Sequence, residues 1–331
     1  QPMDAEGPIA TREALKDIMR FWLDAGCDGF RVDMAGSLVK NDPESKGTIA
    51  LWQNIREFLE EEFPDAAMVS EWGEPDKSLI GGFHMDFLLH FGPSHYNDLF
   101  RCDHPYFSKD AEGSAKEFVA AYQANYAKTD GKGLICIPSG NHDMDRLAKN
   151  LDTDELKAFA FLLSMPGAPF IYYGDEIGMR YVEGLTSVEG GYGRTGSRTP
   201  MQWDDSLSAG FSAARKDKYY IALDESADRP NAKTQSEQED SLRSEVKRLI
   251  AFRKANPALQ SKGEISFVSD DYPLVYKRTS AEQEITVIIN PGADAVTVPN
   301  VNGKVLYTVG GSAVVEKGIV KADGCTAVFV G

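Results

Sequence analysis

Gly29-Phe30-Arg31-Val32-Asp33 is the stretch that decides the fold, because it is a short, mostly apolar run, typical of a β-strand, that ends on a carboxylate. Two later stretches repeat this pattern. Ser70-Glu71-Trp72 follows the run 66–70, and Asn141-His142-Asp143 follows the run 134–137. Active sites of parallel barrels are built at the carboxyl ends of the strands. Three carboxylates in such positions therefore predict chemistry on glycosidic bonds.

The composition of the chain excludes several classes of protein. The 331 residues are 42% hydrophobic, which predicts a substantial core. The net charge of −16 disfavours nucleic acid and anionic membrane surfaces as partners, because both attract basic patches. A neutral sugar is not repelled. We find no apolar run of about 18 residues, so no membrane span is expected.

Cysteine usage and the first residues say less. The four cysteines, Cys27, Cys102, Cys136 and Cys325, contain no CxxC pair, so no zinc or redox motif is visible. The chain opens on Gln1-Pro2-Met3-Asp4, part-way through a pattern and without a signal peptide. The compartment therefore stays unassigned, with a lean towards the cytoplasm.

Strand and helix patterns alternate up to residue 256, which predicts an α/β fold. Strands are expected at 28–32, 66–70, 83–89, 134–137 and 170–173. Trp22 and Trp52, on the apolar faces of the first two helices, are expected in the core. From about 263 the pattern changes to short alternating strands. We therefore predict a partial (β/α) barrel over 1–256 and a small antiparallel β domain over 257–331.

The first two carboxylates fit a retaining glycosidase. Such an enzyme needs a nucleophile and an acid/base about 5–5.5 Å apart. Asp33 and Glu71 lie about one βα unit apart, so adjacent strand ends would bring them together. The shorter Asp33 suits the nucleophile, kept ionised by Arg31 two residues earlier on the same strand face. The longer Glu71 suits the acid/base, which has to reach the glycosidic oxygen.

Three further side chains are candidates for substrate binding. Trp72 offers a sugar-stacking surface. Asp143 would bind sugar hydroxyls and stabilise an oxocarbenium-like transition state, and His142 would donate to the same ring. Each motif alone has an ordinary structural explanation, such as a strand-end ion pair, a helix cap or a turn. Their order and spacing together favour a site.

These residues resemble the α-amylase superfamily, glycoside hydrolase family 13. Residues 29–33 look like its nucleophile motif at the fourth barrel strand, Glu71 its acid/base after the fifth, and Asn141-His142-Asp143 its motif after the seventh. Residues 170–179 are similar to its eighth strand. The loop 193–203, Gly-Arg-Thr-Gly-Ser-Arg-Thr-Pro-Met-Gln-Trp, is typical of α-glucosidases, oligo-1,6-glucosidases and trehalose synthases.

The resemblance implies a (β/α)8-type barrel of which about strands 4 to 8 are present. It also implies a covalent glycosyl–Asp33 intermediate and a substrate that is an α-glucoside or short α-glucan. Arg194 would reach the nonreducing sugar, or would be a solvated loop arginine. Gly36 and Ser37 stand where many amylases carry Lys and His for calcium and substrate contact, so we assign no metal and no cofactor. Met34 leaves the choice between α-1,4 and α-1,6 linkages open.

Two alternatives stay beside the hydrolase. One is a non-catalytic member of the superfamily that binds a sugar or a partner chain, and the other is a trehalose synthase-like isomerase. About five strands cannot close a barrel, because a parallel edge would stay exposed. A separate N-terminal segment, a second copy in a dimer, or the rest of a longer enzyme would have to complete it.

Overall fold

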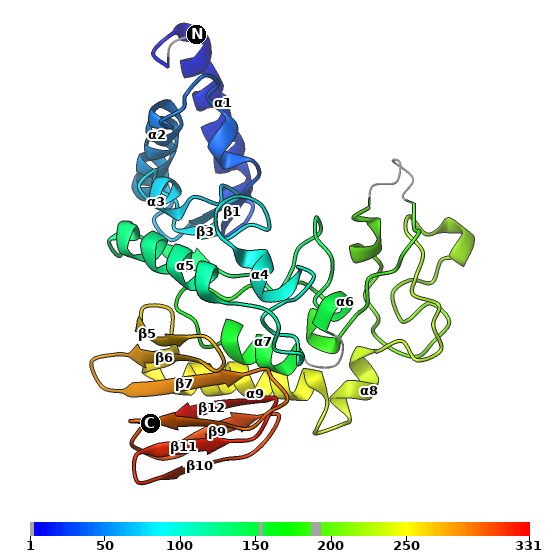
Figure 1. Ribbon diagram of the computed structural model, residues 1–331. Coiled ribbons are helices and arrows are strands. Elements are labelled where there is room, and N and C mark those ends of the chain that lie inside the picture. The colour runs from blue at the N-terminus through cyan, green and yellow to red at the C-terminus, as the bar shows by residue number, and fades with distance from the viewer. Residues whose placement is uncertain (1–2, 152–154, 187–192) are drawn as a thin grey trace. The chain divides into compact units, whose positions relative to one another are not determined.

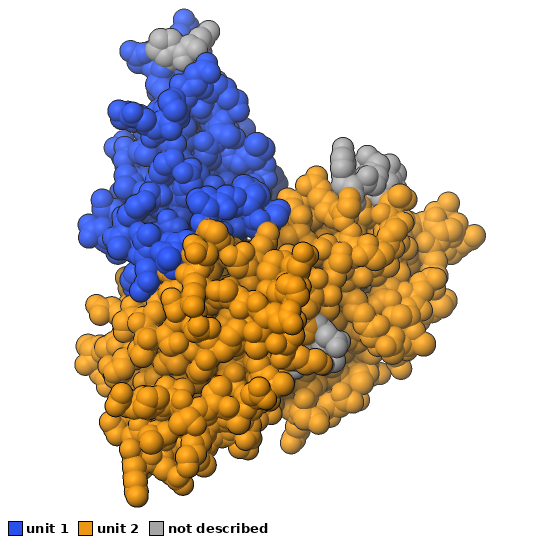
Figure 2. All heavy atoms as spheres, viewed as in Figure 1, with its two compact units in different colours: residues 1–94, 120–136 blue, residues 95–119, 137–331 orange. Residues whose placement is uncertain are grey.

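The computed structural model describes residues 3–151, 155–186 and 193–331 (Figure 1). The chain divides into two compact units (Figure 2). Unit 1 is formed by residues 1–94 and 120–136, and unit 2 by residues 95–119 and 137–331. The first two residues of the opening Gln1-Pro2-Met3-Asp4 motif lie outside the described part.

Unit 1 is built around four short parallel strands. They are β1 (Gly29–Val32), β2 (Ala67–Ser70), β3 (Met85–Phe87) and β4 (Leu134–Cys136), and they lie in that order in the sheet. Its helices are α1 (Glu6–Asp24), α2 (Lys46–Glu62) and α3 (Pro75–Ser78), joined by the C-terminal part of α5 (Lys116–Thr129).

The core of unit 1 lies where α2 meets the sheet. Ile55, Leu59 and Met68 are buried there, together with Trp52, whose indole nitrogen donates to the Ala35 carbonyl at 2.9 Å. The expectation for Trp52 is confirmed. That for Trp22 is wrong: its side chain is half-exposed, whereas Met19 and Leu23 on the same helix are buried.

Unit 2 begins with helices and ends in an antiparallel sandwich. Its helices are α4 (Tyr96–Phe100), α6 (Ala148–Leu151), α7 (Glu155–Leu162), α8 (Ala232–Ser236) and α9 (Leu242–Ala255). Among the described residues, short 3₁₀ turns occur at Ala35–Ser37, Asp175–Ile177, Thr195–Ser197, Lys216–Lys218 and Pro257–Leu259.

The expected strand at 170–173 is reduced to one parallel bridge between Pro138 and Phe170. The Ser139 amide donates to the Phe170 carbonyl at 2.8 Å, but the next contact is made by a side chain, since the Tyr172 amide donates to Ser139 Oγ at 2.9 Å. A side chain therefore replaces the ladder after one bridge.

The C-terminal sandwich contains two antiparallel sheets with the strand orders β5-β6-β7-β12-β9 and β10-β11-β8. The strands are β5 (Glu264–Asp270), β6 (Leu274–Thr279), β7 (Glu284–Asn290), β8 (Val296–Pro299), β9 (Val305–Val309), β10 (Ala313–Glu316), β11 (Ile319–Ala322) and β12 (Thr326–Val330). Val275, Ile288, Val320 and Val328 belong to the core that both sheets share. The alternation seen in the sequence predicted this domain correctly.

The sandwich packs tightly against α7 and α9 within unit 2. Phe252 on α9 stacks on Tyr307, with the ring centroids 4.9 Å apart, and Figure 1 shows α9 running alongside the sandwich. The Ser164 and Tyr276 hydroxyls share a hydrogen bond of 2.5 Å. These contacts explain why the compact units do not divide the chain at residue 256, where the alternation of strand and helix patterns ends. The domain boundary at 256/257 stays a prediction.

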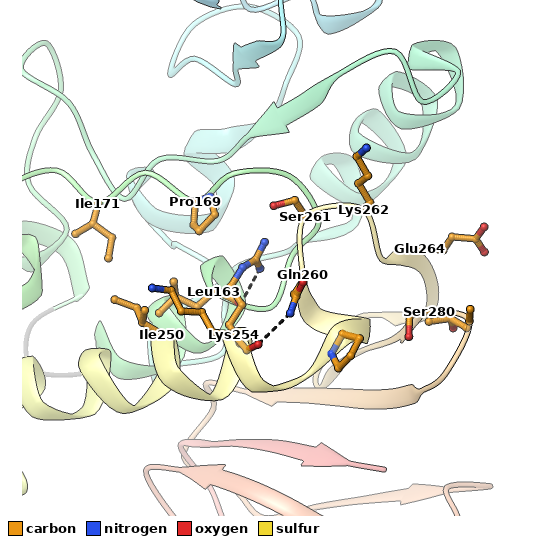
Figure 3. A pocket seen from close by; sticks show the side chains of 14 residues that line it. Leu163, Pro169, Ile171, Ile250, Lys254, Gln260, Ser261, Lys262, Glu264 and Ser280 are labelled. Atoms are coloured by element: carbon orange, nitrogen blue, oxygen red, sulfur yellow. Dashed lines mark hydrogen bonds between the residues drawn. The ribbon is translucent and has the colours of Figure 1, made fainter. Parts of the chain in front are cut away.

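A pocket of about 1080 Å³ opens beside this packing surface in unit 2 (Figure 3). Leu163, Pro169 and Ile171 line one part of it, and Ile250 and Lys254 on α9 line another. None of the predicted site residues lines this pocket. Among the described helices, none combines the length and the apolar character that a membrane crossing needs.

Arg278 is a fully buried cation that is held by backbone carbonyls. Its guanidinium donates to the Ser164 carbonyl, to Gln260 at 2.8 Å and to Gly263 at 3.0 Å. Arg253 ties the same region, donating to the Leu163 and Met165 carbonyls at 2.9 and 2.7 Å. The two side chains fasten the sandwich and α9 to the turn that follows α7.

We predict that Arg278→Met lowers the free energy of unfolding of unit 2 by about 3 kcal/mol, because several buried carbonyls lose their donor at once. Urea titration followed by circular dichroism measures the change. The neighbouring Lys277 forms an exposed ion pair with Glu284, and Lys277→Met is the matched control, expected to cost less than about 1 kcal/mol. Equal effects of the two variants would contradict the prediction.

Candidate active site

The parallel pairing of β1 with β2 brings two of the predicted carboxylates together in unit 1. Val32 lies opposite Ser70, so the next residues, Asp33 and Glu71, leave neighbouring strands at the same edge. Arg31 joins them: Nη1 donates to Asp33 Oδ1, and Nη2 lies 3.0 Å from Glu71 Oε1. One guanidinium therefore holds both carboxylates.

The two carboxylates have different surroundings. The Asp33 side chain is 70% exposed, whereas that of Glu71 is 15% exposed. Glu71 Oε2 also accepts the Met34 amide at 3.0 Å. Met34 has the left-handed conformation, with φ of 45°, which is uncommon for a residue other than glycine and directs its N–H to Glu71. Solvent therefore reaches the carboxylate of Asp33 more freely than that of Glu71.

The backbone of Glu71 is fixed on the β1 side. Its amide donates to the Val32 carbonyl at 2.9 Å, and its carbonyl accepts the Ala35 amide at 3.2 Å. These bonds continue the ladder between β1 and β2 by one residue. The side chain of Glu71 therefore starts from a backbone position that the sheet defines.

Asp86 on β3 fixes the next amides from the other side. It lies opposite Ser70 in the sheet and is fully buried. Its Oδ1 accepts the Ser70 hydroxyl at 2.7 Å and the amides of Trp72 and Gly73 at 3.2 and 3.3 Å. Burial raises the pKa of Asp86 to about 6, although these donors and the Ser78 hydroxyl oppose the shift.

Trp72 lies in the core of unit 1. Its ring packs edge-on against Phe83 and its indole nitrogen donates to Glu74 Oε2 at 3.2 Å. A Cβ added at Gly36 would come within 2.6 Å of the indole, so a lysine there would require Trp72 to move. The ring is buried, which corrects the expectation of an exposed sugar-stacking surface.

Asp143, the third predicted carboxylate, is the centre of a basic cluster in unit 2. Its Oδ1 accepts Arg194 Nη1 at 2.6 Å and Arg198 Nη2 at 2.7 Å. His142 Nε2 lies 3.4 Å from the other carboxylate oxygen. Arg198 also donates through Nε to the His142 carbonyl at 2.7 Å. Arg194 therefore is not a merely solvated loop residue.

The loop that carries both arginines is anchored on the Tyr172-Tyr173 pair. The Tyr172 hydroxyl donates to the Ser197 carbonyl at 3.1 Å, and the Tyr173 hydroxyl to Thr199 at 2.6 Å. Arg194 and Arg198 flank the 3₁₀ turn Thr195–Ser197, which brings both to Asp143. The Tyr172-Tyr173 pair and the arginine loop, which lie apart in the sequence, therefore both help to hold the carboxylate of Asp143.

A buried ion pair between Arg146 and Asp175 lies against these tyrosines. Asp175 accepts Arg146 Nη1 at 3.1 Å and the Ser139 hydroxyl at 2.7 Å, and neither side chain of the ion pair is exposed. Burial raises the pKa of Asp175. The Arg146 guanidinium also lies 4.8 Å from the ring centroid of Tyr172. The pair therefore stiffens the segment from which the arginine loop is held.

One group of potential metal ligands converges in the described part of the chain. His104, Asp110 and Glu112 place their ligand atoms within 4.8 Å of one another, and all three are exposed. His104 Nδ1 lies 3.0 Å from Glu112 and 3.9 Å from Asp110. This is the geometry of a surface ion pair, which is common without a metal. The spacing of these residues in the sequence did not indicate this group.

Two residues of the candidate site were missed by the sequence analysis. Arg198 lies inside the quoted loop 193–203, and its spacing of four from Arg194 was the available signal. Asp86 is a lone acid inside the apolar stretch 83–89, which was the only sign of its role. In both cases folding brings the hydrogen-bond partner near, so the sequence motif alone could not predict the contact.

The parallel sheet with two carboxylates directly after its strands, followed by an antiparallel sandwich, is what we expect of part of a (β/α)8-type barrel with a C-terminal β domain. A family model described as the alpha-amylase catalytic domain matches residues 7–262. The chain belongs to this family. The fold predicted from the sequence, a barrel of this type followed by a small antiparallel β domain, is thereby confirmed.

Several named enzymes are similar to this chain in sequence. The trehalose synthase/amylase TreS of Mycobacterium tuberculosis is 28% identical over 295 residues, covering 75% of this chain and 47% of TreS. The oligo-1,6-glucosidase of Parageobacillus thermoglucosidasius is 29% identical over 349 residues, covering 86% of this chain and 60% of that protein. The chain thus spans about half to three-fifths of these relatives.

Solved structures agree on the fold. Amy13B of Eubacterium rectale superposes with a TM-score of 0.77 at 23% identity, covering 99% of this chain and 63% of Amy13B. A variant of the trehalulose synthase MutB gives a TM-score of 0.78 at 20% identity, covering 99% of this chain and 69% of MutB. At these identities the likeness concerns the fold alone.

We predict that Asp86→Asn changes how stability depends on pH. The folded state holds the Asp86 proton more tightly than the unfolded chain, whose ordinary pKa is 3.8, so wild-type stability falls as pH rises from about 4 to about 6. The loss amounts to about 3 kcal/mol, and an amide at this position does not incur it. Near pH 4 the two proteins should be equally stable, and at pH 7 the variant should be more stable.

Urea titrations of both proteins between pH 4 and pH 7 measure this difference. Asp28→Asn, which removes an exposed carboxyl just before β1, controls for the loss of one negative charge. Parallel stability curves for wild type and Asp86→Asn across the range would show that Asp86 does not titrate there.

Proposed function

We propose that this protein is a retaining α-glycoside hydrolase that acts on α-glucosides or short α-glucans. The observation that carries the proposal is the single Arg31 guanidinium shared by Asp33 and Glu71, one carboxylate exposed and the other mostly enclosed. Two carboxylates with different surroundings at adjacent strand ends suit a nucleophile and an acid/base. Membership of the alpha-amylase catalytic-domain family supports the same chemistry.

The first step uses Asp33 as the nucleophile. Its carboxylate attacks the anomeric carbon, and Glu71 gives its proton to the glycosidic oxygen. The bond between the anomeric carbon and that oxygen breaks, and the electron pair stays on the leaving oxygen. Arg31 contacts both carboxylates and orients them. The product of this step is a glycosyl ester of Asp33 and a free leaving group.

The second step returns both carboxylates to their starting state. Glu71, now ionised, takes a proton from water, and the oxygen of that water attacks the anomeric carbon. The ester bond to Asp33 breaks and its electrons return to the carboxylate. Two inversions at the same carbon leave the α configuration unchanged. The Met34 amide, bonded to Glu71 Oε2, keeps that oxygen in place through both steps.

Asp143 with Arg194 and Arg198 forms the proposed sugar-binding group. Its Oδ1 accepts two guanidinium contacts, which fix the orientation of the carboxylate. A fixed carboxylate accepts hydrogen bonds from sugar hydroxyls and stabilises developing positive charge on the ring. His142 and Arg194 supply donors to the same hydroxyls. That Asp143 acts on the sugar held by Asp33 stays a prediction.

An isomerase is the second candidate, favoured by the match to TreS. Maltose separates the two, because a hydrolase makes two glucose molecules and an isomerase makes trehalose. A non-catalytic binding protein would bind maltose without turning it over. The proposed partner of a hydrolase or an isomerase is therefore an α-glucoside, and a non-catalytic member would bind a sugar or a partner chain. We propose neither a nucleic acid nor a membrane as a partner.

We expect Asp33→Asn to reduce turnover of p-nitrophenyl α-glucoside and of maltose by about 10³-fold or more, because the ester can no longer form. Released glucose is measured, and proton NMR of the first product should show the α anomer. Asp28→Asn is the matched control and should keep full activity. Undiminished turnover by Asp33→Asn, or β-glucose as the first product, would refute the retaining mechanism through Asp33.

We further expect Arg194→Met and Arg198→Met each to lower kcat/KM about tenfold, because each removes one donor that fixes Asp143. The double variant should lose less than the product of the two, since both donors bind the same oxygen. Arg215→Met, in an exposed part of unit 2, is the control. Independent, fully multiplicative losses would show that the two arginines do not act through one carboxylate.

A further inference from the structure

The peptide group between Glu71 and Trp72 is held at both of its ends. Its carbonyl, from Glu71, accepts the Ala35 amide at 3.2 Å. Its N–H, from Trp72, donates to Asp86 Oδ1 at 3.2 Å. A shift of the chain at Trp72 would carry the Glu71 Cα, and with it the carboxyl, away from Arg31 and Met34. The contact of the Trp72 amide with Asp86 opposes that shift.

Asp86 is placed for this task by the sheet. It lies opposite Ser70, and its Oδ1 collects three donors: the Ser70 hydroxyl, the Trp72 amide and the Gly73 amide. Gly73 has a φ of 78°, a conformation that favours glycine and that turns its N–H towards the same oxygen. The chain after β2 is thus wound around one buried carboxylate oxygen.

The other oxygen of Asp86 is not used for this purpose. Within the described residues, neither Oδ2 nor the nearby Ser78 hydroxyl makes a hydrogen bond of standard geometry, although the hydroxyl lies close enough to favour the ionised carboxyl. A buried polar atom left in this state destabilises the fold by about 1–3 kcal/mol. Stability alone therefore does not account for an acid at this position, whereas the three donors on Oδ1 do define a role for it.

We propose that Asp86 is a positioning residue for Glu71, which it orients by binding the Trp72 and Gly73 amides through Oδ1. This inference rests on the proposed function, since Glu71 is taken as the acid/base. Because Asp86 is fully buried, we assign it no contact with the substrate. It acts through the two amides that directly follow Glu71 in the chain.

The inference separates two kinds of substrate. With maltose, Glu71 must protonate the glycosidic oxygen while the bond to the anomeric carbon breaks. With α-glucosyl fluoride, fluoride leaves with the bonding electron pair and needs little help from a proton. A displaced Glu71 should therefore slow the first step with maltose far more than with the fluoride. A general loss of folding would slow both alike.

The experiment compares kcat/KM for these two substrates. Asp86→Ala removes the acceptor and should lower kcat/KM about 30-fold for maltose and less than about threefold for α-glucosyl fluoride. Asp86→Asn keeps Oδ1 as an acceptor and should restore most of the rate with maltose. Leu88→Ala is the control: it opens a cavity at a fully buried position just after β3 and should affect both substrates equally.

Two results would overturn the inference: an equal loss on both substrates in Asp86→Ala, or no loss on either. If Asp86→Ala does not fold, Asp86→Leu, which fills the volume and lacks the acceptor, takes its place with the same expectations. Wild-type protein that turns over neither substrate, or activity that survives Asp33→Asn, would instead refute the proposed function.

Amide hydrogen exchange tests whether Asp86 holds the Trp72 and Gly73 amides, and it does not depend on enzyme activity. The Trp72 and Gly73 amides should exchange slowly in wild type and in Asp86→Asn, and at least about tenfold faster in Asp86→Ala, relative to the Glu71 amide that β1 holds. Leu88→Ala should leave this ratio unchanged. Unchanged protection of both amides in Asp86→Ala would overturn the inference even in a protein without activity.

Discussion

The parallel register between β1 and β2 is the constraint on which the candidate site depends. It places Val32 opposite Ser70, so that Asp33 and Glu71 follow at the same edge and meet one arginine. A shift by one residue would turn every side chain of β1 to the other face and separate Arg31 from Glu71. The buried faces of the sheet exclude that shift, because Met68 and its neighbours on β2 fill the core of unit 1.

Burial in this protein is used to fix polar groups as well as to exclude water. Arg278 and Arg253 donate to backbone carbonyls around the turn after α7. Asp175 pairs with Arg146, whose guanidinium lies against the rings of Tyr172 and Tyr173. Such groups are expensive to bury and strongly destabilising to break, so each one restricts the arrangement of its surroundings. In unit 2 the ion pair contacts Tyr172 and Tyr173, and the two tyrosine hydroxyls bind the loop whose arginines contact Asp143. The ion pair thereby limits the movement of that loop.

The sequence allowed the carboxylates to be predicted, because strand ends and acids are both local signals. Asp33 and Glu71 needed only an apolar run followed by an acid. Asp86 and Arg198 could not be predicted in this way, since their partners are backbone amides and a carboxylate brought near by folding. The strand at 170–173 was overpredicted, because its apolar composition does not show that Ser139 supplies a side chain in place of the ladder. The buried indole of Trp72 likewise depends on the absence of a side chain at Gly36.

Energetics argue that the arginine–carboxylate contacts serve orientation more than stability. The pair between Arg31 and Asp33 is largely exposed, and exposed ion pairs contribute about 0–1 kcal/mol because water screens them. Asp86 goes further, since its burial raises its pKa to about 6 and makes the ionised form a burden on the fold near neutral pH. Groups that add little to stability, or reduce it, yet fix specific donors and acceptors around Glu71 suit the proposed mechanism, in which Glu71 holds one position through two proton transfers.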